Sequence, residues 1–368
     1  MKQGWEVKTL GEICEVLDSK RKPVTKRDRM AGEYPYYGAT GILDYVDEYI
    51  FDEKLVLIGE DGAKWEAGEW TAFIAEGKYW VNNHAHVIRP NRSVVLDNWI
   101  VYFLYFSDLH KYVTGLTVPK LNQEKMRSIT LPVPPIPEQQ RIVAVLDEAF
   151  ASIAQAKANA ERNLVNAREL FDAVQKEIFT SGENDWEEKR IDEVCKNLDS
   201  QRIPVTKRDR KEGKYPYYGA SGIVDYVSEF IFDEDLLLVS EDGANLLART
   251  YPIAFSISGK TWVNNHAHVL RFEKMETQKF VEYYLNSIPL DDYVSGMAQP
   301  KLNQAMLNSI VIPFPQLTEQ RAIVERLEAL SAETGRLEAV YRSKVAGLEE
   351  LKKSVLQRAF EGELSIEN

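Results

Sequence analysis

Histidines with the spacing of metal ligands occur twice in the sequence, in the pentapeptide Asn-Asn-His-Ala-His at residues 82–86 and 264–268. On a strand, His84 and His86 would lie on the same face, as two metal ligands can. No Asp, Glu or Cys at a suitable spacing nearby supplies a third ligand, so we expect structural histidines and no bound metal. The same segments offer hydrogen-bonding groups for base edges, and the candidate readers are Asn82, Asn83, His84, Asn264, Asn265 and His266.

Adjacent carboxylates precede a glycine in the segments Glu-Asp-Gly-Ala at 60–63 and 241–244. Neighbouring residues of a strand point to opposite faces, so these carboxylates are a poor acid and base pair. A turn, or a carboxylate that accepts a hydrogen bond from cytosine N4, fits them better. A duplicated hydrolase that uses Asp61 and Asp242 remains an open alternative.

Other enzyme signatures fail on their residue types. The stretch Ala254–Thr261 has Ala where a phosphate-binding loop begins with Gly, and its counterpart has Tyr79 where a Ser or Thr must hold Mg²⁺. The chain contains no Gly-x-Ser-x-Gly element, no Cys/His nucleophile pattern and no Asn/Asp-Pro-Pro-Tyr/Phe tetrapeptide of amino-methyltransferases. None of these motifs therefore identifies a catalytic site, and we expect no cofactor.

A basic segment, Pro-Val-Thr-Lys-Arg-Asp-Arg, occurs at 23–29 and again at 204–210, although the formal net charge of the chain is −12. Lysine and arginine for phosphates, with tyrosines for base edges, are typical of a DNA-binding surface. A solvated basic loop beside a buried Tyr/Pro turn is the alternative. The further DNA-binding candidates are Lys20, Arg21, Lys26, Arg27, Arg29, Tyr36, Tyr37, Lys120, Arg202, Lys207, Arg208, Arg210, Tyr217, Tyr218 and Lys301.

The whole chain is a duplication. Residues 18–53 and 199–234 are identical at 27 of 36 aligned positions, and Pro-Lys-Leu-Asn-Gln recurs at 119–123 and 300–304. Short apolar runs bounded by Gly and Asp predict strands in each copy. Helices are expected at 96–113 and 278–288. The fold class is therefore α/β (α+β), with a mixed or antiparallel sheet in each of two tandem domains.

After the proline-rich stretches at 131–139 and 312–320, long segments with almost no Pro or Gly carry heptad repeats. In the first, one heptad position holds Ile142, Ala149, Ala156, Asn163 and Leu170, and another holds Leu146, Ile153, Ala160, Ala167 and Val174. In the second, the positions hold Ile323, Leu330, Leu337, Lys344 and Leu351, and Leu327, Thr334, Tyr341, Leu348 and Val355. Such seams favour two helices that pair as an antiparallel coiled coil and relate the domains by a pseudo-two-fold axis. Two helices packed separately on their own domains are the alternative.

The composition limits the class of protein. With 44% hydrophobic residues the 368-residue chain can fill real cores, and no apolar run approaches the length of a membrane span. The start lacks the apolar centre of a signal peptide. Cys14 and Cys195 occupy equivalent positions without zinc spacing, so we expect reduced, structural thiols in a cytoplasmic protein.

The order of motifs resembles the specificity subunit of type I restriction–modification systems. In both copies Trp-x4-[Leu/Ile]-x-Glu-[Ile/Val]-Cys opens the repeat at 5–14 and 186–195. The Tyr-Gly-Ala-[Thr/Ser]-Gly and Pro-Lys-Leu-Asn motifs follow, and Glu-Gln then opens a long segment. The chain finishes with Gln-Arg-Ala-Phe-Glu-Gly-Glu-Leu at 357–364. The resemblance covers essentially the full length.

The resemblance implies two target recognition domains, 1–137 and 184–318, and two spacer helices, 138–183 and 319–368. Each domain would read one half of a bipartite site in double-stranded DNA. DNA adenine methyltransferase subunits, and restriction (helicase-nuclease) subunits where present, would supply the catalysis. Because family members usually carry two dissimilar domains, the near-identity of these copies predicts similar, inverted half-sites. A non-catalytic adaptor that binds a protein or another polymer is the alternative.

Overall fold

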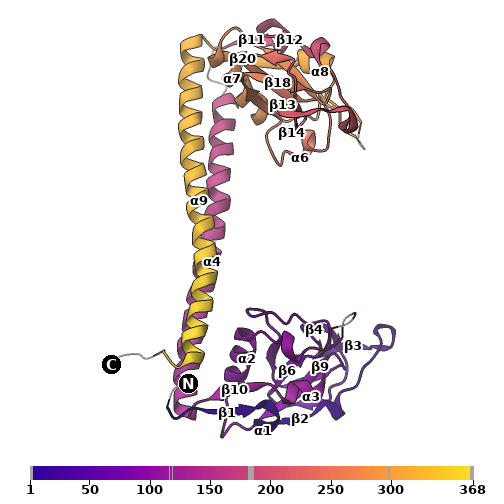
Figure 1. Cartoon of the computed structure of the whole chain (residues 1–368), viewed down its shortest axis with the longest axis vertical. Coiled ribbons are helices and arrows are strands. Elements are labelled where there is room, and N and C mark those ends of the chain that lie inside the picture. The colour runs from indigo at the N-terminus through magenta and orange to yellow at the C-terminus, as the bar shows by residue number, and fades with distance from the viewer. Residues whose placement is uncertain (1–2, 116, 118, 181–185, 297–298, 365–368) are drawn as a thin grey trace. The chain divides into compact units, whose positions relative to one another are not determined.

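The computed structural model describes residues 3–115, 117, 119–180, 186–296 and 299–364. The chain divides into two compact units (Figure 1). Unit 1 comprises Met1–Glu161 with Ser343–Asn368, and unit 2 comprises Arg162–Arg342. Each unit holds one copy of the sequence repeat and part of both long helices. The expected boundary between residues 183 and 184 lies outside the described residues.

Unit 1 contains two four-stranded sheets and a two-stranded ribbon. The strands are β1 (Glu6–Thr9), β2 (Cys14–Val16), β3 (Ala31–Gly38), β4 (Gly41–Val46), β5 (Phe51–Asp52), β6 (Leu55–Gly59), β7 (Ala72–Ala75), β8 (Lys78–Val81), β9 (Ala85–Pro90) and β10 (Thr130–Val133); the short helices are α1 (Leu10–Ile13), α2 (Asp97–Phe106) and α3 (Gln123–Arg127). The sheet orders are β2-β9-β6-β7 and β4-β3-β8-β5, and β1 pairs with β10. Strands β3 and β8 run parallel whereas the other pairs are antiparallel, which confirms a mixed α/β domain.

Strand β6 shows why this unit folds as it does. All five of its residues are buried. Val56 and Ile58 face a core that includes Trp99 of α2, whereas Leu55 and Leu57 face a second core. Because successive side chains of a strand point to opposite faces, a continuous apolar run requires cover on both sides.

Unit 2 repeats this plan. Its strands are β11 (Glu187–Arg190), β12 (Lys196–Asn197), β13 (Glu212–Gly219), β14 (Gly222–Val227), β15 (Phe232–Asp233), β16 (Leu236–Ser240), β17 (Ala254–Ile257), β18 (Lys260–Val263), β19 (Ala267–Arg271) and β20 (Val311–Phe314); the short helices are α5 (Ile191–Val194), α6 (Asn245–Ala248), α7 (Met275–Ser287) and α8 (Gln304–Ser309). The sheet orders are β12-β19-β16-β17 and β14-β13-β18-β15, with β11 paired to β20. The two copies therefore keep the same topology.

The two 45-residue helices are α4 (Ile136–Thr180) and α9 (Leu317–Glu361). In unit 1 the beginning of α4 and the end of α9 enter the same core, and Phe360 packs on Trp99 with ring centres 4.9 Å apart. In unit 2 the beginning of α9 and the end of α4 do so, and Phe179 lies 5.4 Å from Phe280. The helices are thus antiparallel, as the heptads predict.

The heptad seam is only partly buried. Leu146, Ile153, Ala160 and Ala167 lie inside, and so do Leu327 and Thr334 of α9. At the other predicted position Leu170 and Leu351 are exposed. A pair of helices leaves the flanks of its seam in water, so only part of the heptad pattern is buried. Ion pairs flank the seam: Lys157 with Glu349 in unit 1 and Arg168 with Glu338 in unit 2.

Candidate nucleic-acid interface

The cationic loop, residues 20–29 in unit 1 and 201–210 in unit 2, is fixed to the sheet behind it. The Trp80 indole donates to the Lys22 carbonyl at 2.6 Å, and the Val24 amide donates to the Tyr36 hydroxyl at 3.0 Å. Trp262 and Tyr217 hold Ile203 and Val205 in the same way. The backbone of each loop is therefore anchored while its exposed side chains remain in water.

The structure corrects the expected positions of several loop residues. Tyr36 and Tyr217 are buried, and the guanidinium groups of Arg29 and Arg210 each lie 4.3 Å from the centre of the corresponding tyrosine ring. Both arginines also bind a carboxylate, Asp44 or Asp225. These four residues were expected on the DNA-facing surface. They instead form the inner side of the loop, because the tyrosine hydroxyl is needed to satisfy the loop backbone.

The cations that remain accessible are those at the outer side of the loop. Arg27 and Arg208 have 86% and 87% of their side chains exposed, and each forms an ion pair with the aspartate that follows it. Lys20, Lys26 and Lys207 are exposed as well. Tyr37 and Tyr218 are half-buried and pack on Phe73 and Phe255. Exposed cations of this kind can bind phosphates without losing an internal partner.

Arg21 and Arg202, also expected to meet DNA, lie in a buried network. Arg21 Nη1 donates to Glu60 Oε2 at 2.5 Å and to the Ala85 carbonyl at 2.8 Å. His86 Nδ1 lies 2.6 Å from Asp18 Oδ2, and His86 Nε2 lies 2.7 Å from the Leu121 carbonyl. The same arrangement occurs in unit 2, where it is formed by Arg202, Glu241, His268 and Asp199. The network joins the cationic loop to the Pro-Lys-Leu-Asn-Gln loop.

Burial alone would raise the pKa of the Asp18 carboxyl. Hydrogen bonds from His86 and Gln123 outweigh that effect and hold the pKa below its usual value. In the same way the His268 contact holds the pKa of Asp199 below its usual value despite burial. Both carboxylates are therefore charged and paired inside the protein.

The same network bears on metal binding. Asp18, Glu60 and His86 lie close enough together to hold a metal ion, as do Asp199, Glu241 and His268. The expectation that no carboxylate lies near these histidines is therefore wrong, because distant loops supply them. Both ring nitrogens of His86 already contact protein oxygens, and the Arg21 guanidinium neutralises the carboxylates. Those contacts favour an ion-pair network over a metal site.

At the surface, His84 forms a pair with Asp61. The His84 ring is half-exposed and its Nδ1 atom contacts Asp61 Oδ1, whereas the His86 ring is fully buried. The two histidines do not share a face, because residues 83 and 84 form a turn between β8 and β9. In unit 2, His266 Nδ1 lies 2.8 Å from Asp242 Oδ2. Each pair presents an imidazole oriented by a carboxylate.

Residues beside this pair complete the surface. Lys120 Nζ lies 2.9 Å from Glu60 Oε1 and 3.8 Å from Asp61 Oδ2, and Lys301 contacts Glu241 at 3.1 Å. Asn82 and Asn264 are buried, and their Oδ1 atoms accept the backbone amides of His84 and His266 at 2.8 Å. These asparagines, expected to read bases, instead fix the turn. Asn83 and Asn265 are exposed.

The four-residue turn between β3 and β4 adjoins the same surface. Gly38 lies beside the Asn82 amide nitrogen, and Gly59, next to Glu60, lies beside the Ala39 carbonyl. Sequence reasoning missed the exposed apolar residues that follow this turn. Their signal is present in the duplication, because Ile42 and Ile223 are identical and the next position is apolar in both copies.

The copies differ between β6 and β7. In unit 1 the Trp70 ring packs 4.2 Å from Tyr105, and Lys352 lies over both rings. In unit 2 the corresponding segment forms α6, and the exposed Tyr251 hydroxyl lies 3.0 Å from Ser221 Oγ beside the β13–β14 turn. The surroundings of the two turns are therefore not identical.

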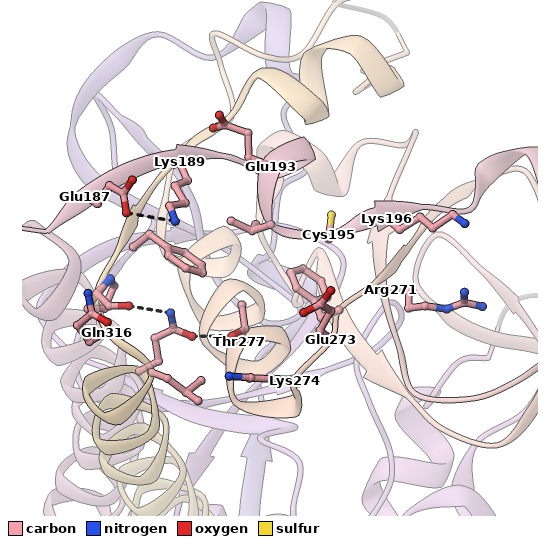
Figure 2. Close-up of a pocket in the computed structure, with 16 residues that line it drawn as sticks. Glu187, Lys189, Glu193, Cys195, Lys196, Arg271, Glu273, Lys274, Thr277 and Gln316 are labelled. Atoms are coloured by element: carbon pink, nitrogen blue, oxygen red, sulfur yellow. Dashed lines mark hydrogen bonds and ion pairs between the residues drawn. The ribbon is translucent and has the colours of Figure 1, made fainter.

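A separate pocket of about 720 Å³ lies in unit 2, near the beginnings of α7 and α9 (Figure 2). Its walls mix cations such as Lys274 with carboxylates such as Glu193, and the Gln320 side-chain Oε1 atom accepts from the Thr277 hydroxyl at 2.8 Å. Cys195 lines it, and burial raises the pKa of this thiol to about 12. A thiol of that pKa is inert at neutral pH. This pocket shares no residue with the loops described above.

None of the helices in the described part of the chain has a stretch long and apolar enough to cross a membrane.

Comparisons with known proteins agree with this architecture. The family model described as the type I restriction modification DNA specificity domain matches residues 2–162 and again residues 183–344. A putative type I restriction enzyme specificity subunit of Haemophilus influenzae is 36% identical over 157 residues, which is 43% of this chain and 40% of that protein. The MjaVIII specificity subunit of Methanocaldococcus jannaschii is 23% identical over 100% of this chain and 94% of its own length.

Solved structures show the same fold. A chain from a study of complex assembly and conformational transition of the type I R-M system has a TM-score of 0.75 at 18% identity, covering 99% of each chain. The HsdS subunit from Thermoanaerobacter tengcongensis has a TM-score of 0.63 at 18% identity, covering 99% of this chain and 98% of its own. Because the family model matches both repeats over most of the sequence, the chain belongs to the type I restriction–modification DNA specificity family.

Proposed function

We propose that this chain is the DNA sequence-recognition subunit of a type I restriction–modification complex, and that each repeat reads one half of a bipartite site. One observation carries the proposal most directly. Arg27, His84 and Lys120 recur as Arg208, His266 and Lys301, with the same ion-pair partners in each unit. Exposed cations beside oriented polar groups suit a surface that binds phosphates and meets base edges.

The roles of the residues follow from their exposure. Lys20, Lys26 and Arg27, with Lys207 and Arg208, have side chains free to bind phosphates. Asn83, His84 and Lys120, with their copies, supply donors and acceptors for base edges. Arg21, Arg29, Tyr36 and Asn82, with their copies, hold those groups in place from inside the protein.

We further propose that the chain is not itself catalytic and acts in the cytoplasm, where its DNA is. DNA adenine methyltransferase subunits would supply methylation, and restriction subunits, where present, would supply cleavage. The domains at 1–137 and 184–318 would carry recognition and the helical segments would act as spacers. The family membership supports this division of labour.

The near-identity of the copies supports a nearly palindromic, interrupted target. Sequencing of modified adenines in cells that express this chain with its methyltransferase subunits is the test. We expect one bipartite motif whose halves are similar and inverted. Loss of the motif when this chain is omitted supports the recognition role, whereas two unrelated half-sequences contradict the palindrome alone. A difference confined to one base pair would be consistent with the differing segments that contain Trp70 and Tyr251.

A further inference from the structure

Two neighbouring apolar side chains at the start of β4 remain in water. Ile42 is 47% exposed and Leu43 is 52% exposed. In unit 2 Ile223 and Val224 occupy the same positions and are 48% and 54% exposed. An exposed apolar residue is ordinary, but an adjacent pair at the same place in both copies calls for a partner.

Ile42 and Leu43 lie at a β-bulge of β4. Tyr37 is opposite Ile42 and Tyr36 is opposite Asp44, so Leu43 is an extra residue in β4. The same register shift occurs between Tyr217 and Tyr218 in unit 2. In a regular strand neighbouring side chains alternate between faces, but a bulge breaks the alternation and redirects a side chain. Both apolar groups are consequently accessible, although they follow one another in sequence.

The pair adjoins the candidate DNA surface. Leu43 packs so closely over Gly38 that a Cβ atom at that glycine would lie 2.4 Å from Leu43 Cδ1, and the same position lies 3.4 Å from the Asn82 amide nitrogen. Asn82 in turn accepts the His84 amide at 2.8 Å. Three contacts, through Gly38 and Asn82, therefore connect the apolar pair to His84, whose imidazole is held by Asp61.

Charge near the pair favours a polyanion as the partner. Asp44 follows Leu43 directly, but it accepts a hydrogen bond from Arg29 at 3.2 Å, so its negative charge is compensated within the protein. The exposed Arg27 belongs to the same loop. A second copy of this surface would bring like charges together, whereas DNA brings phosphates to the cations and base edges to the apolar pair.

We propose that Ile42 with Leu43, and Ile223 with Val224, form apolar contacts for the C5-methyl groups of thymines in the major groove. That methyl is the apolar group which the major-groove edge offers, and it separates thymine from cytosine. The polar residues nearby would read the neighbouring pairs. The inference rests on the DNA-recognition role proposed above and names part of its specificity.

The test uses the full chain in complex with its methyltransferase subunits and a duplex that carries the mapped site. Each thymine is replaced in turn by deoxyuridine, which lacks the methyl group, and the dissociation constant is measured by fluorescence anisotropy. We expect the affinity to fall about fourfold for at least one thymine in each half-site, which is the effect of removing one buried methyl group. The Ile42→Ser/Leu43→Ser variant should lose this sensitivity in one half-site, and Ile223→Ser/Val224→Ser should lose it in the other.

Val165→Ser, which changes an exposed apolar residue of α4, is the matched control and should keep both sensitivities. Unchanged thermal unfolding of the variants would show that they fold. If no thymine methyl is coupled to these residues while Arg27→Glu/Arg208→Glu still weakens binding, the inference is overturned and the DNA-recognition role stands. Unstacking of 2-aminopurine next to the site, lost in the serine variants, would also overturn it in favour of insertion between bases. If the wild-type complex binds no specific site, the proposed function itself fails.

Discussion

The Nδ1 atom of His266 lies 2.8 Å from Oδ2 of Asp242, and His84 contacts Asp61 in the same manner in the other unit. In both pairs the imidazole is half-exposed and the carboxylate is more buried. The carboxylate therefore fixes the ring from inside, and among the described residues the Nε2 atoms of both rings have no hydrogen-bond partner. This geometry is suited to a directed hydrogen bond with a base edge.

Substituting Asp61→Asn or Asp242→Asn should weaken binding to the specific site by up to about tenfold, the value of one hydrogen bond. Binding to a scrambled duplex should hardly change, since phosphate contacts are intact. Competition anisotropy with both duplexes measures the ratio. An equal loss on both duplexes would show that the pair acts on the backbone and does not read bases.

Charge reversal at Arg27 and Arg208 should weaken binding to all sequences alike. Each lost phosphate contact lowers the slope of log K against log salt by about 1, so the double variant should lose about 2. Arg336→Glu/Arg342→Glu, which changes two exposed arginines of α9, makes the same charge change away from the cationic loop and is the control. A salt slope equal to that of the wild type would exclude these arginines from the interface.

The buried carboxylates predict acid sensitivity. The folded-state pKa of Asp18 and of Asp199 is lowered, so each contributes stability that is present above the unfolded pKa of about 3.9 and is lost as pH falls through the folded pKa. Asp18→Asn should cost about 3 kcal/mol at pH 7, because Arg21 and His86 lose a buried partner. It should also flatten the decline of stability below about pH 4.

The free energy of unfolding in urea, measured from about pH 2 to about pH 7, tests this prediction. This range covers the ordinary pKa of an aspartate and the values below it. Asp47→Asn, which changes an exposed carboxylate, should leave the pH profile unchanged. A profile in Asp18→Asn with the same pH dependence as the wild type would contradict the lowered folded-state pKa of Asp18.

The end of α9 should be essential to unit 1 alone. Phe360 lies within 5.4 Å, between ring centres, of Trp99, Phe103 and Phe106. Phe360→Ala should destabilise unit 1 by about 3 kcal/mol and speed hydrogen exchange in α2. In unit 2, Phe179 packs on Phe280 of α7, so the backbone amides of α7 should keep their protection from hydrogen exchange. Leu351→Ala, at an exposed position of α9, is the control, and equal exchange in α2 for both variants would contradict the packing.

Much of the fold could be predicted from the sequence. The duplication indicated two like domains, the apolar run at Leu55–Gly59 indicated a strand, and the heptads indicated antiparallel helices. These features are local or periodic, so the pattern of residue types determines them. The burial of the second heptad position in α4 follows from the same periodicity.

The side-chain roles within the candidate surface depended on long-range contacts. The sequence alone identified the cationic loop, the histidine pentapeptide and the carboxylates as chemically distinctive. Only the tertiary structure separated Arg27, which is exposed, from Arg21, which pairs with Glu60 inside the protein. Likewise, only the tertiary structure shows that Tyr36 is buried and that the half-exposed His84 pairs with Asp61. Residue type determines what a side chain can do chemically. Contacts between distant segments determine whether that side chain is exposed at the surface or paired inside the protein.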